Sequence, residues 1–204
     1  LRWYAGTPCP CAPVPLCPRA PVPLCVSILR SVNIGLPAPL ETAKGRVLSG
    51  IVKAPVAGRV RAHRLGLGGD GQADLTVHGG PAKAIYAYSH DHYPYWADAL
   101  GRADLGPGSF GENLTVDGML EGDVRIGDIY RIGSAVLQVT QPRSPCFKLA
   151  AHLGLPDFPK SFLASGRSGF YLRVLEEGDL GAGDAIERIS SPPTGLTVLE
   201  ASRR

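Results

Sequence analysis

Cysteine is almost absent from the chain beyond residue 25, where Cys146 stands alone among 179 residues. One cysteine cannot form an internal disulfide, so a disulfide framework is excluded and a reducing cytoplasm is the expected compartment. Long apolar runs are missing too, and we expect no membrane-spanning segment. No G-x-G-x-x-G or P-loop motif follows a predicted strand, which leaves a dinucleotide or nucleoside-triphosphate fold without support.

Charge of one sign is also scarce. The 204 residues include 21 Lys and Arg against 18 Asp and Glu, a net charge of +3. So small an excess predicts no direct nucleic-acid binding. Aromatic residues make up only 7%, whereas 26 glycines and 19 prolines are present. This composition favours one mostly β domain rich in turns over a helical bundle.

Residues 1–25 differ from the rest of the chain. They contain seven prolines, no Asp, Glu, Lys or His, and the cysteines Cys9, Cys11, Cys17 and Cys25. The prolines forbid the apolar helix of a secretory signal, and the Cys9-Pro-Cys11 spacing is tight for one tetrahedral zinc ion. We therefore expect a disordered leader, with the natural chain starting near Val26. The folded domain is expected over 26–192, followed by a short C-terminal tail, 193–204.

Beyond the leader the sequence predicts short strands separated by turn residues. The expected strands are 27–34, 47–52, 59–67, 83–88, 124–132, 135–140, 170–175 and 185–189. Gly133-Ser134 predicts a hairpin between 124–132 and 135–140, and 170–175 is expected to pair with 185–189. Irregularly spaced Gly-Asp dipeptides are typical of loops in a β-barrel rather than of a solenoid.

Two helices are expected. One follows Ser89, a good N-cap, although Pro94 would interrupt it unless the helix starts late. The other runs from about Lys148 to Leu153 and ends at Gly154. His90 and His92 are spaced i and i+2, which places them on different helix faces. We expect ordinary solvated histidines there rather than a metal pair.

The stretch Gln141-Pro-Arg-Ser-Pro-Cys-Phe-Lys-Leu149 holds the candidate reactive group, Cys146. It lies between a predicted strand end and a predicted helix start, where unpaired N–H groups favour an anion. Arg143 and Lys148 add positive charge, and two prolines restrict the backbone. Each effect stabilises the thiolate, which is both the nucleophile and the metal-binding form of cysteine.

Two further clusters carry weaker signals. The first is Gly68-Gly-Asp-Gly-Gln-Ala-Asp-Leu-Thr-Val-His-Gly-Gly80 with Lys83 after it, in which Gly79 and Gly80 could present N–H groups to an anion. The second is Gly106-Pro-Gly-Ser-Phe-Gly-Glu-Asn-Leu114, in which Asn113 could read a heterocycle or orient Cys146. Taken singly, the first is more typical of a tight barrel turn with a solvated His78, and the second is also typical of a loop that packs Phe110 into the core.

Together, in this order, the three motifs resemble the MOSC domain family (molybdenum cofactor sulfurase C-terminal domain), and in particular its YiiM-like branch. The resemblance covers roughly residues 27–197. It implies a mostly β, closed or partly open barrel with a few short helices. Many YiiM-like proteins continue into a small helical segment that has no counterpart before Arg204.

The resemblance further implies a molybdenum cofactor of the molybdopterin type, with Cys146 as catalytic residue and molybdenum ligand. The cofactor-binding residues it implies are Asp70, Gln72, His78, Gly79, Gly80, Lys83, Asn113 and Arg143. The implied activity is reduction of N-hydroxylated compounds such as hydroxylaminopurine bases. The implied partners are that small substrate, an electron-donor redox protein and, as one option, a second copy in a homodimer.

Two other interpretations remain open from the residues alone. Cys146 could carry a persulfide or hand on cofactor without substrate turnover. It could also act as a hydrolytic nucleophile with His78 as its base. Pyridoxal phosphate is not expected, because no lysine stands out as its Schiff-base partner.

Overall fold

The computed structural model describes residues 27–74 and 79–204. The predicted leader and His78 lie outside this range. The strands are β1 (Ser27–Ile34), β2 (Ala38–Thr42), β3 (Gly45–Ser49), β4 (Ala54–Pro55), β5 (Arg59–His63), β6 (Gly66–Leu67), β7 (Ile85–Ser89), β8 (Leu114–Asp117), β9 (Ile129–Ile132), β10 (Ala135–Pro142), β11 (Phe170–Glu176), β12 (Gly178–Gly181) and β13 (Ala185–Ser190). The helices are η1 (Pro81–Lys83), η2 (His90–His92), α1 (Tyr93–Leu100), α2 (Phe147–Leu153), α3 (Phe158–Ala164) and α4 (Val198–Ser202).

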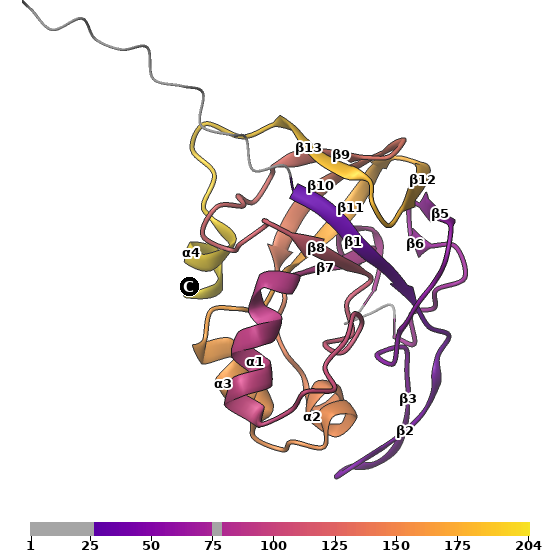
Figure 1. Cartoon of the computed structure of the whole chain (residues 1–204), viewed down its shortest axis with the longest axis vertical. Coiled ribbons are helices and arrows are strands. Elements are labelled where there is room, and N and C mark those ends of the chain that lie inside the picture. The colour runs from indigo at the N-terminus through magenta and orange to yellow at the C-terminus, as the bar shows by residue number, and fades with distance from the viewer. Residues whose placement is uncertain (1–26, 75–78) are drawn as a thin grey trace, which may run out of the picture.

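The main sheet closes on itself as a barrel, as predicted. Its strands follow the order β13-β9-β10-β11-β7-β8-β1, and β1 pairs with β13 to complete the circle. Every pair in this circle is antiparallel except β7–β8, which is parallel. Closure removes free sheet edges. A small sheet, β12-β5-β6, and the separate β2–β3 ribbon lie beside the barrel (Figure 1).

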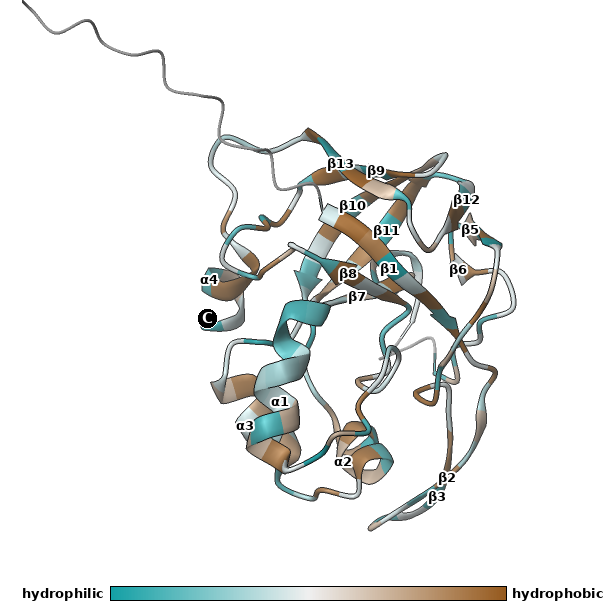
Figure 2. Cartoon of the chain, in the orientation of Figure 1, coloured by the Kyte–Doolittle hydropathy of each residue, from teal (hydrophilic) through white to brown (hydrophobic). Residues whose placement is uncertain are grey.

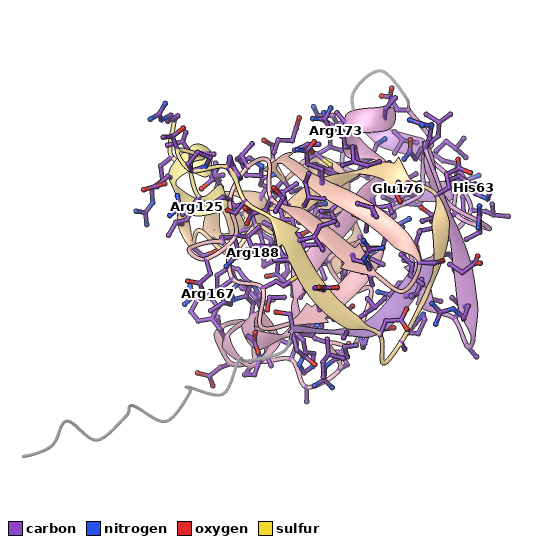
Figure 3. The ribbon with its side chains drawn as sticks, turned by 90° about the horizontal axis from the view of Figure 1, so that it is seen from above. His63, Arg125, Arg167, Arg173, Glu176 and Arg188 are labelled. Atoms are coloured by element: carbon purple, nitrogen blue, oxygen red, sulfur yellow. The ribbon has the colours of Figure 1, made fainter. Side chains whose placement is uncertain are left out.

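Two apolar clusters support the fold. One fills the barrel, and the other lies between its lower end and the helices α1 to α3 (Figure 1). Aromatic rings dominate the second cluster, where Trp96 stacks on Phe162 at 5.6 Å between ring centroids. Apolar residues are concentrated on the barrel strands and on α2 and α3 (Figure 2). Charged side chains such as Arg125, Arg173 and Arg188 lie on the outside (Figure 3).

Strand pairing follows the prediction in one case and departs from it in another. The hairpin of β9 and β10 is confirmed, with Ala135 opposite Ile132. The predicted pairing of 170–175 with 185–189 is wrong, because β11 pairs with β10 and β7 while β13 pairs with β9 and β1. The intervening residues form β12, which pairs with β5 and carries the chain away from β11. The expected strand 59–67 is two strands, β5 and β6, folded back on each other.

Both helix predictions are confirmed, and Pro94 is accommodated in the first turn of α1, where a missing N–H costs little. Ser89 caps the preceding η2, accepting a bond from the Asp91 N–H. The expectation of a solvated His92 is wrong. This residue is buried, and its Nε2 lies 2.7 Å from Oε2 of the equally buried Glu121.

The segment expected as a tail contains α4. Thr197 and Glu200 form a capping box at its start, and the buried Val198 donates its N–H to the carbonyl of Val124. This end of the chain is therefore attached to the barrel. None of the described helices is long and apolar enough to cross a membrane.

Candidate functional site

Cys146 occupies the junction predicted for it, between the end of β10 and the start of α2. Its backbone is extended, with φ −130° and ψ 171°, and its carbonyl accepts the Leu149 N–H at 3.0 Å. The side chain is partly exposed. At the other end of α2, Gly154 adopts the left-handed conformation that stops the helix.

A pocket opens beside Cys146, with about 620 Å³ of space free of protein atoms, open solvent at its mouth included. Its walls come from six segments of the chain, most of them far apart in sequence. The lining residues are Ser49, Gly50, Ile51, Lys53, Asp70, Gly71, Gln72, Ala73, Asp74, Lys83, Tyr86, Gly111, Asn113, Arg143, Cys146, Lys148 and Tyr171.

Most of the predicted site residues meet in this pocket, namely Asp70, Gln72, Lys83, Asn113, Arg143 and Cys146. Gly79 and Gly80 are not among the lining residues. The N–H of Gly80 donates to Oε1 of Gln72 at 3.1 Å, so it is engaged inside the protein rather than presented to an anion. His78 lies outside the described residues, and its predicted role stays a prediction.

Arg143 is the most unusual polar group of the pocket. Its guanidinium lies 4.7 Å from the ring centroid of Tyr86 and 5.8 Å from that of Phe162. The side chain is buried, and among the described residues its Nη1 has no hydrogen-bond partner. Burial acts to lower the pKa of Arg143, but Tyr86, Tyr171 and Cys146 outweigh burial and raise it. The pocket therefore contains a buried positive charge, one nitrogen of which is unsatisfied by the described part of the chain.

Asp70 joins two walls of the pocket. Its Oδ1 accepts the Gly35 N–H at 2.9 Å and lies 2.5 Å from Nζ of Lys53, and both charged side chains are buried. Its Oδ2 accepts a bond from Nδ2 of Asn113 at 2.8 Å. Asn113 in turn accepts the Tyr86 N–H on Oδ1 at 3.1 Å. Both predicted cofactor residues thus hold the walls in place.

Lys53 was not predicted from the sequence. It follows β3 in a loop whose pattern carries no motif, and only its contact with Asp70 places it at the site. Tyr86 and Tyr171 were missed as well, since each lies within a mostly apolar strand, β7 or β11, and looks like an ordinary strand residue. Their ring centroids are 5.6 Å apart. Only the pairing of β7 with β11 brings them together.

Gln72 also acts within the protein. Its Nε2 donates to the carbonyl of Leu65 at 3.1 Å, while Oε1 accepts the Gly80 bond described above. The pocket is also lined by the positive charges of Arg143, Lys83 and Lys148, the carboxylate of Asp74, the ring of Tyr171 and the sulfur of Cys146.

Glu112 organises the loop that forms the Gly111 side of the pocket. Fully buried, it accepts the N–H groups of Gly108 at 2.8 Å and Phe110 at 3.0 Å, and the hydroxyls of Thr115 and Tyr93. Burial raises its pKa, although these hydrogen bonds oppose the shift. The motif carboxylate is therefore a support for the loop.

The described residues contain no group of three or more His, Cys, Asp or Glu side chains placed to hold a metal ion. A pocket with one thiol and several cations suits a ligand that carries negative charge. These observations define a class: a closed β-barrel with a cationic, cysteine-containing ligand pocket at one end.

Comparison with known proteins gives the family. The MOSC domain model matches residues 74–187. Uncharacterized protein YflK of Bacillus subtilis (strain 168) is 44% identical over 173 residues, which are 85% of this chain and 78% of that protein. The crystal structure of YiiM from Geobacillus stearothermophilus superposes with a TM-score of 0.72 at 37% identity, covering 87% of this chain and 82% of that one.

The chain belongs to the MOSC domain family and to its YiiM-like branch. It is also similar to a protein of Gibberella moniliformis named Reductase, at 38% identity over 162 residues. These are 78% of this chain but only 29% of the fungal protein.

Proposed function

We propose that this protein binds a molybdenum cofactor of the molybdopterin type in the Cys146 pocket and reduces N-hydroxylated compounds, hydroxylaminopurine bases among them. The observation that carries the proposal is the buried Arg143, whose Nη1 has no partner in the described chain, in the same pocket as a thiol. A buried unpaired donor is costly, and an anionic ligand removes that cost. The name Reductase of the fungal relative supports the redox class.

Each pocket residue then has a defined task. The Cys146 thiolate would hold the metal, because thiolates are strong ligands for soft metal centres. Arg143, Lys83 and Lys148 would neutralise the anionic groups of the cofactor. Tyr171 would provide an aromatic surface for its ring system, while Tyr86 supports the Arg143 guanidinium. Asp70, Gln72 and Asn113 hold the walls at the required separation.

When bound, the cofactor would supply two-electron redox chemistry, by which an N-hydroxyl compound, two protons and two electrons give the amine and water. The electrons require a donor, and we propose a separate redox protein. A reducing compartment such as the cytoplasm would keep the Cys146 sulfur reduced, and therefore able to bind the metal as a thiolate.

The test uses the full chain, expressed in a host that makes the cofactor. Elemental analysis of molybdenum and fluorescence of the extracted, oxidised pterin should both show loading of the wild-type protein. Cys146→Ser should lower the molybdenum content about tenfold or more, and abolish reduction of hydroxylaminopurine by a chemically reduced dye. Ser144→Ala, an exposed change in the same loop, should leave both unchanged.

Absence of metal and pterin from the wild-type protein would overturn the proposal, as would a fully loaded and active serine variant. Stoichiometric sulfane sulfur on Cys146 without reductase activity would select the alternative, a carrier of sulfur or cofactor. Activity of Cys146 on an ester or amide, abolished by changing His78, would select the hydrolase.

A further inference from the structure

A second buried polar cluster lies outside the pocket and has no part in the proposed chemistry. It consists of Glu121, which follows β8, and His92 of η2. Their side chains are only 5% and 9% exposed, and His92 Nε2 lies 2.7 Å from Glu121 Oε2. Neither lines the pocket. Buried charged groups are expensive unless they are paired and hydrogen-bonded, so their presence calls for a reason.

The other oxygen of this carboxylate leads to the pocket. Oε1 of Glu121 accepts the N–H of Gly169 at 2.7 Å. On its opposite side, the carbonyl of Gly169 accepts the backbone N–H of Arg143 at 3.1 Å. The peptide groups on either side of Gly169 therefore connect a buried carboxylate outside the pocket with the arginine inside it.

The backbone conformation of Gly169 is tightly restricted. Its φ of 68° is left-handed, and a Cβ there would lie 2.4 Å from the Ala87 carbonyl oxygen. The preceding Ser168 carbonyl accepts the hydroxyl of Tyr86 at 2.8 Å. Tyr86 is the ring against which the Arg143 guanidinium packs. Backbone and side chain of Arg143 thus both depend on the segment that Glu121 holds.

We propose that Glu121, supported by His92, is a positioning residue for Arg143: it fixes the backbone of Gly169, and with it the place at which the guanidinium enters the pocket. This inference rests on the proposed role of Arg143 in binding an anionic ligand. It adds a residue that contacts neither cofactor nor substrate, and it can be tested without either.

The test measures the charge that Cys146 experiences. The rate of alkylation of Cys146 by iodoacetate, an anion, is divided by the rate with neutral iodoacetamide. Peptide mass mapping follows Cys146 separately from the leader cysteines. A nearby positive charge raises this ratio, and Arg143→Met should lower it about fivefold. Glu121→Leu, which leaves the Gly169 N–H without its acceptor, should lower it at least about twofold.

Two conservative variants separate positioning from general damage. Glu121→Gln retains an oxygen for the Gly169 N–H and should keep the wild-type ratio. Glu121→Asp withdraws the carboxylate by about 1.5 Å, the length of one C–C bond, and should lower the ratio even if the leucine variant does not fold. The matched control is Asp128→Ala. Asp128 is also a fully buried carboxylate that accepts a backbone N–H, from Arg125 at 2.9 Å, but it lies outside the pocket.

The ratio should remain at the wild-type value in the Asp128 variant, although its melting temperature falls. Folded Glu121→Asp with an unchanged ratio would overturn the proposal. So would an equal loss in the Asp128 variant, or an Arg143→Met ratio equal to wild type. None of these results depends on molybdenum loading, so failure of the proposed function and failure of this inference remain distinguishable.

Discussion

At the scale of single residues, Arg143 and Cys146 differ in what they cost the free energy of folding, although both are proposed to bind the same ligand. A partly exposed cysteine is tolerated at little cost, whereas a buried guanidinium whose Nη1 has no partner in residues 27–74 and 79–204 costs free energy of folding. Such a penalty is typically about 1–3 kcal/mol, and more for a charged group. A bound anion that accepts a hydrogen bond from Nη1 would offset this penalty, which gives a reason for a buried arginine at position 143.

Arg143→Met should therefore separate stability from binding. Methionine fills similar space against Tyr86 without burying a charge, so we expect a melting temperature equal to wild type or a few degrees higher. Stabilisation by added inorganic phosphate, measured by differential scanning fluorimetry, should be lost. Arg173→Met, on the exposed face of β11 (Figure 3), should keep the phosphate response. A large loss of stability in the Arg143 variant would contradict this account.

At the scale of elements, α2 shows how local sequence and tertiary context combine. Its end is encoded locally: Gly154 is left-handed with φ 71°, and the Leu155 N–H donates to the Ala150 carbonyl at 2.9 Å, which is the Schellman arrangement. A short helix carries little stability of its own. Packing of Leu149 and Leu153 into the aromatic cluster therefore holds Cys146 at the pocket.

Gly154→Ala tests how much the left-handed glycine at the end of α2 contributes to stability. A Cβ at this position would meet no atom within 4 Å, so the change introduces backbone strain alone. We expect a loss of about 1 kcal/mol in the free energy of unfolding by urea, and a melting temperature about 2–4 °C lower. Gly154→Asn should recover much of this, because asparagine tolerates left-handed backbone. Equal stabilities of the alanine variant and wild type would show that α2 does not depend on this stop.

At the scale of the whole molecule, the barrel closes where the ends of the sheet order meet, at β1 and β13. Asp184 stands at this closure. Its carboxylate accepts bonds from Nη1 and Nη2 of Arg59, both at 2.9 Å, and from the Gly181 N–H. Its carbonyl accepts the Leu29 N–H of β1. One residue thus joins the small sheet to the closing pair of the barrel.

This arrangement predicts an acid dependence of stability. The hydrogen bond from Arg59 holds the pKa of Asp184 below its ordinary value of about 3.8. A carboxylate whose pKa is lower in the folded state stabilises above the unfolded pKa, and the contribution is lost as pH falls through the folded pKa. Asp184→Asn should melt about 2 °C below wild type at pH 7. The difference should begin to shrink below about pH 4 and disappear only as pH falls through the lower folded pKa.

The matched control is Asp157→Asn, at an exposed carboxylate whose neighbour is the exposed Lys160. Its melting temperature should parallel that of wild type across the same pH range. A constant difference between Asp184→Asn and wild type from pH 7 to pH 3 would contradict the proposed ion pair.

Much of this molecule could be predicted from its sequence, because several signals are local. Turn residues separate the strands, a capping serine and a terminal glycine bound two helices, and the order of three motifs indicates the family. The junction of β10 and α2 at Cys146 was predictable for the same reason. Six predicted site residues meet in one pocket because all belong to those motifs.

Other features depend on which strands become neighbours. The partners of β11 and β13, the burial of His92 against Glu121, and the places of Lys53 and Tyr171 at the pocket arise only when the barrel closes. Pairing between distant strands is decided by the whole sheet, since each strand can satisfy its hydrogen bonds with several partners. The sequence by itself determined many of the turns, the limits of two helices and the place of Cys146 between a strand and a helix. Arg143 and Lys148 are neighbours of Cys146 in the chain. Tertiary structure decided which further charges surround this cysteine, because Lys53, Asp70 and Lys83 come from segments that approach it only in the closed barrel.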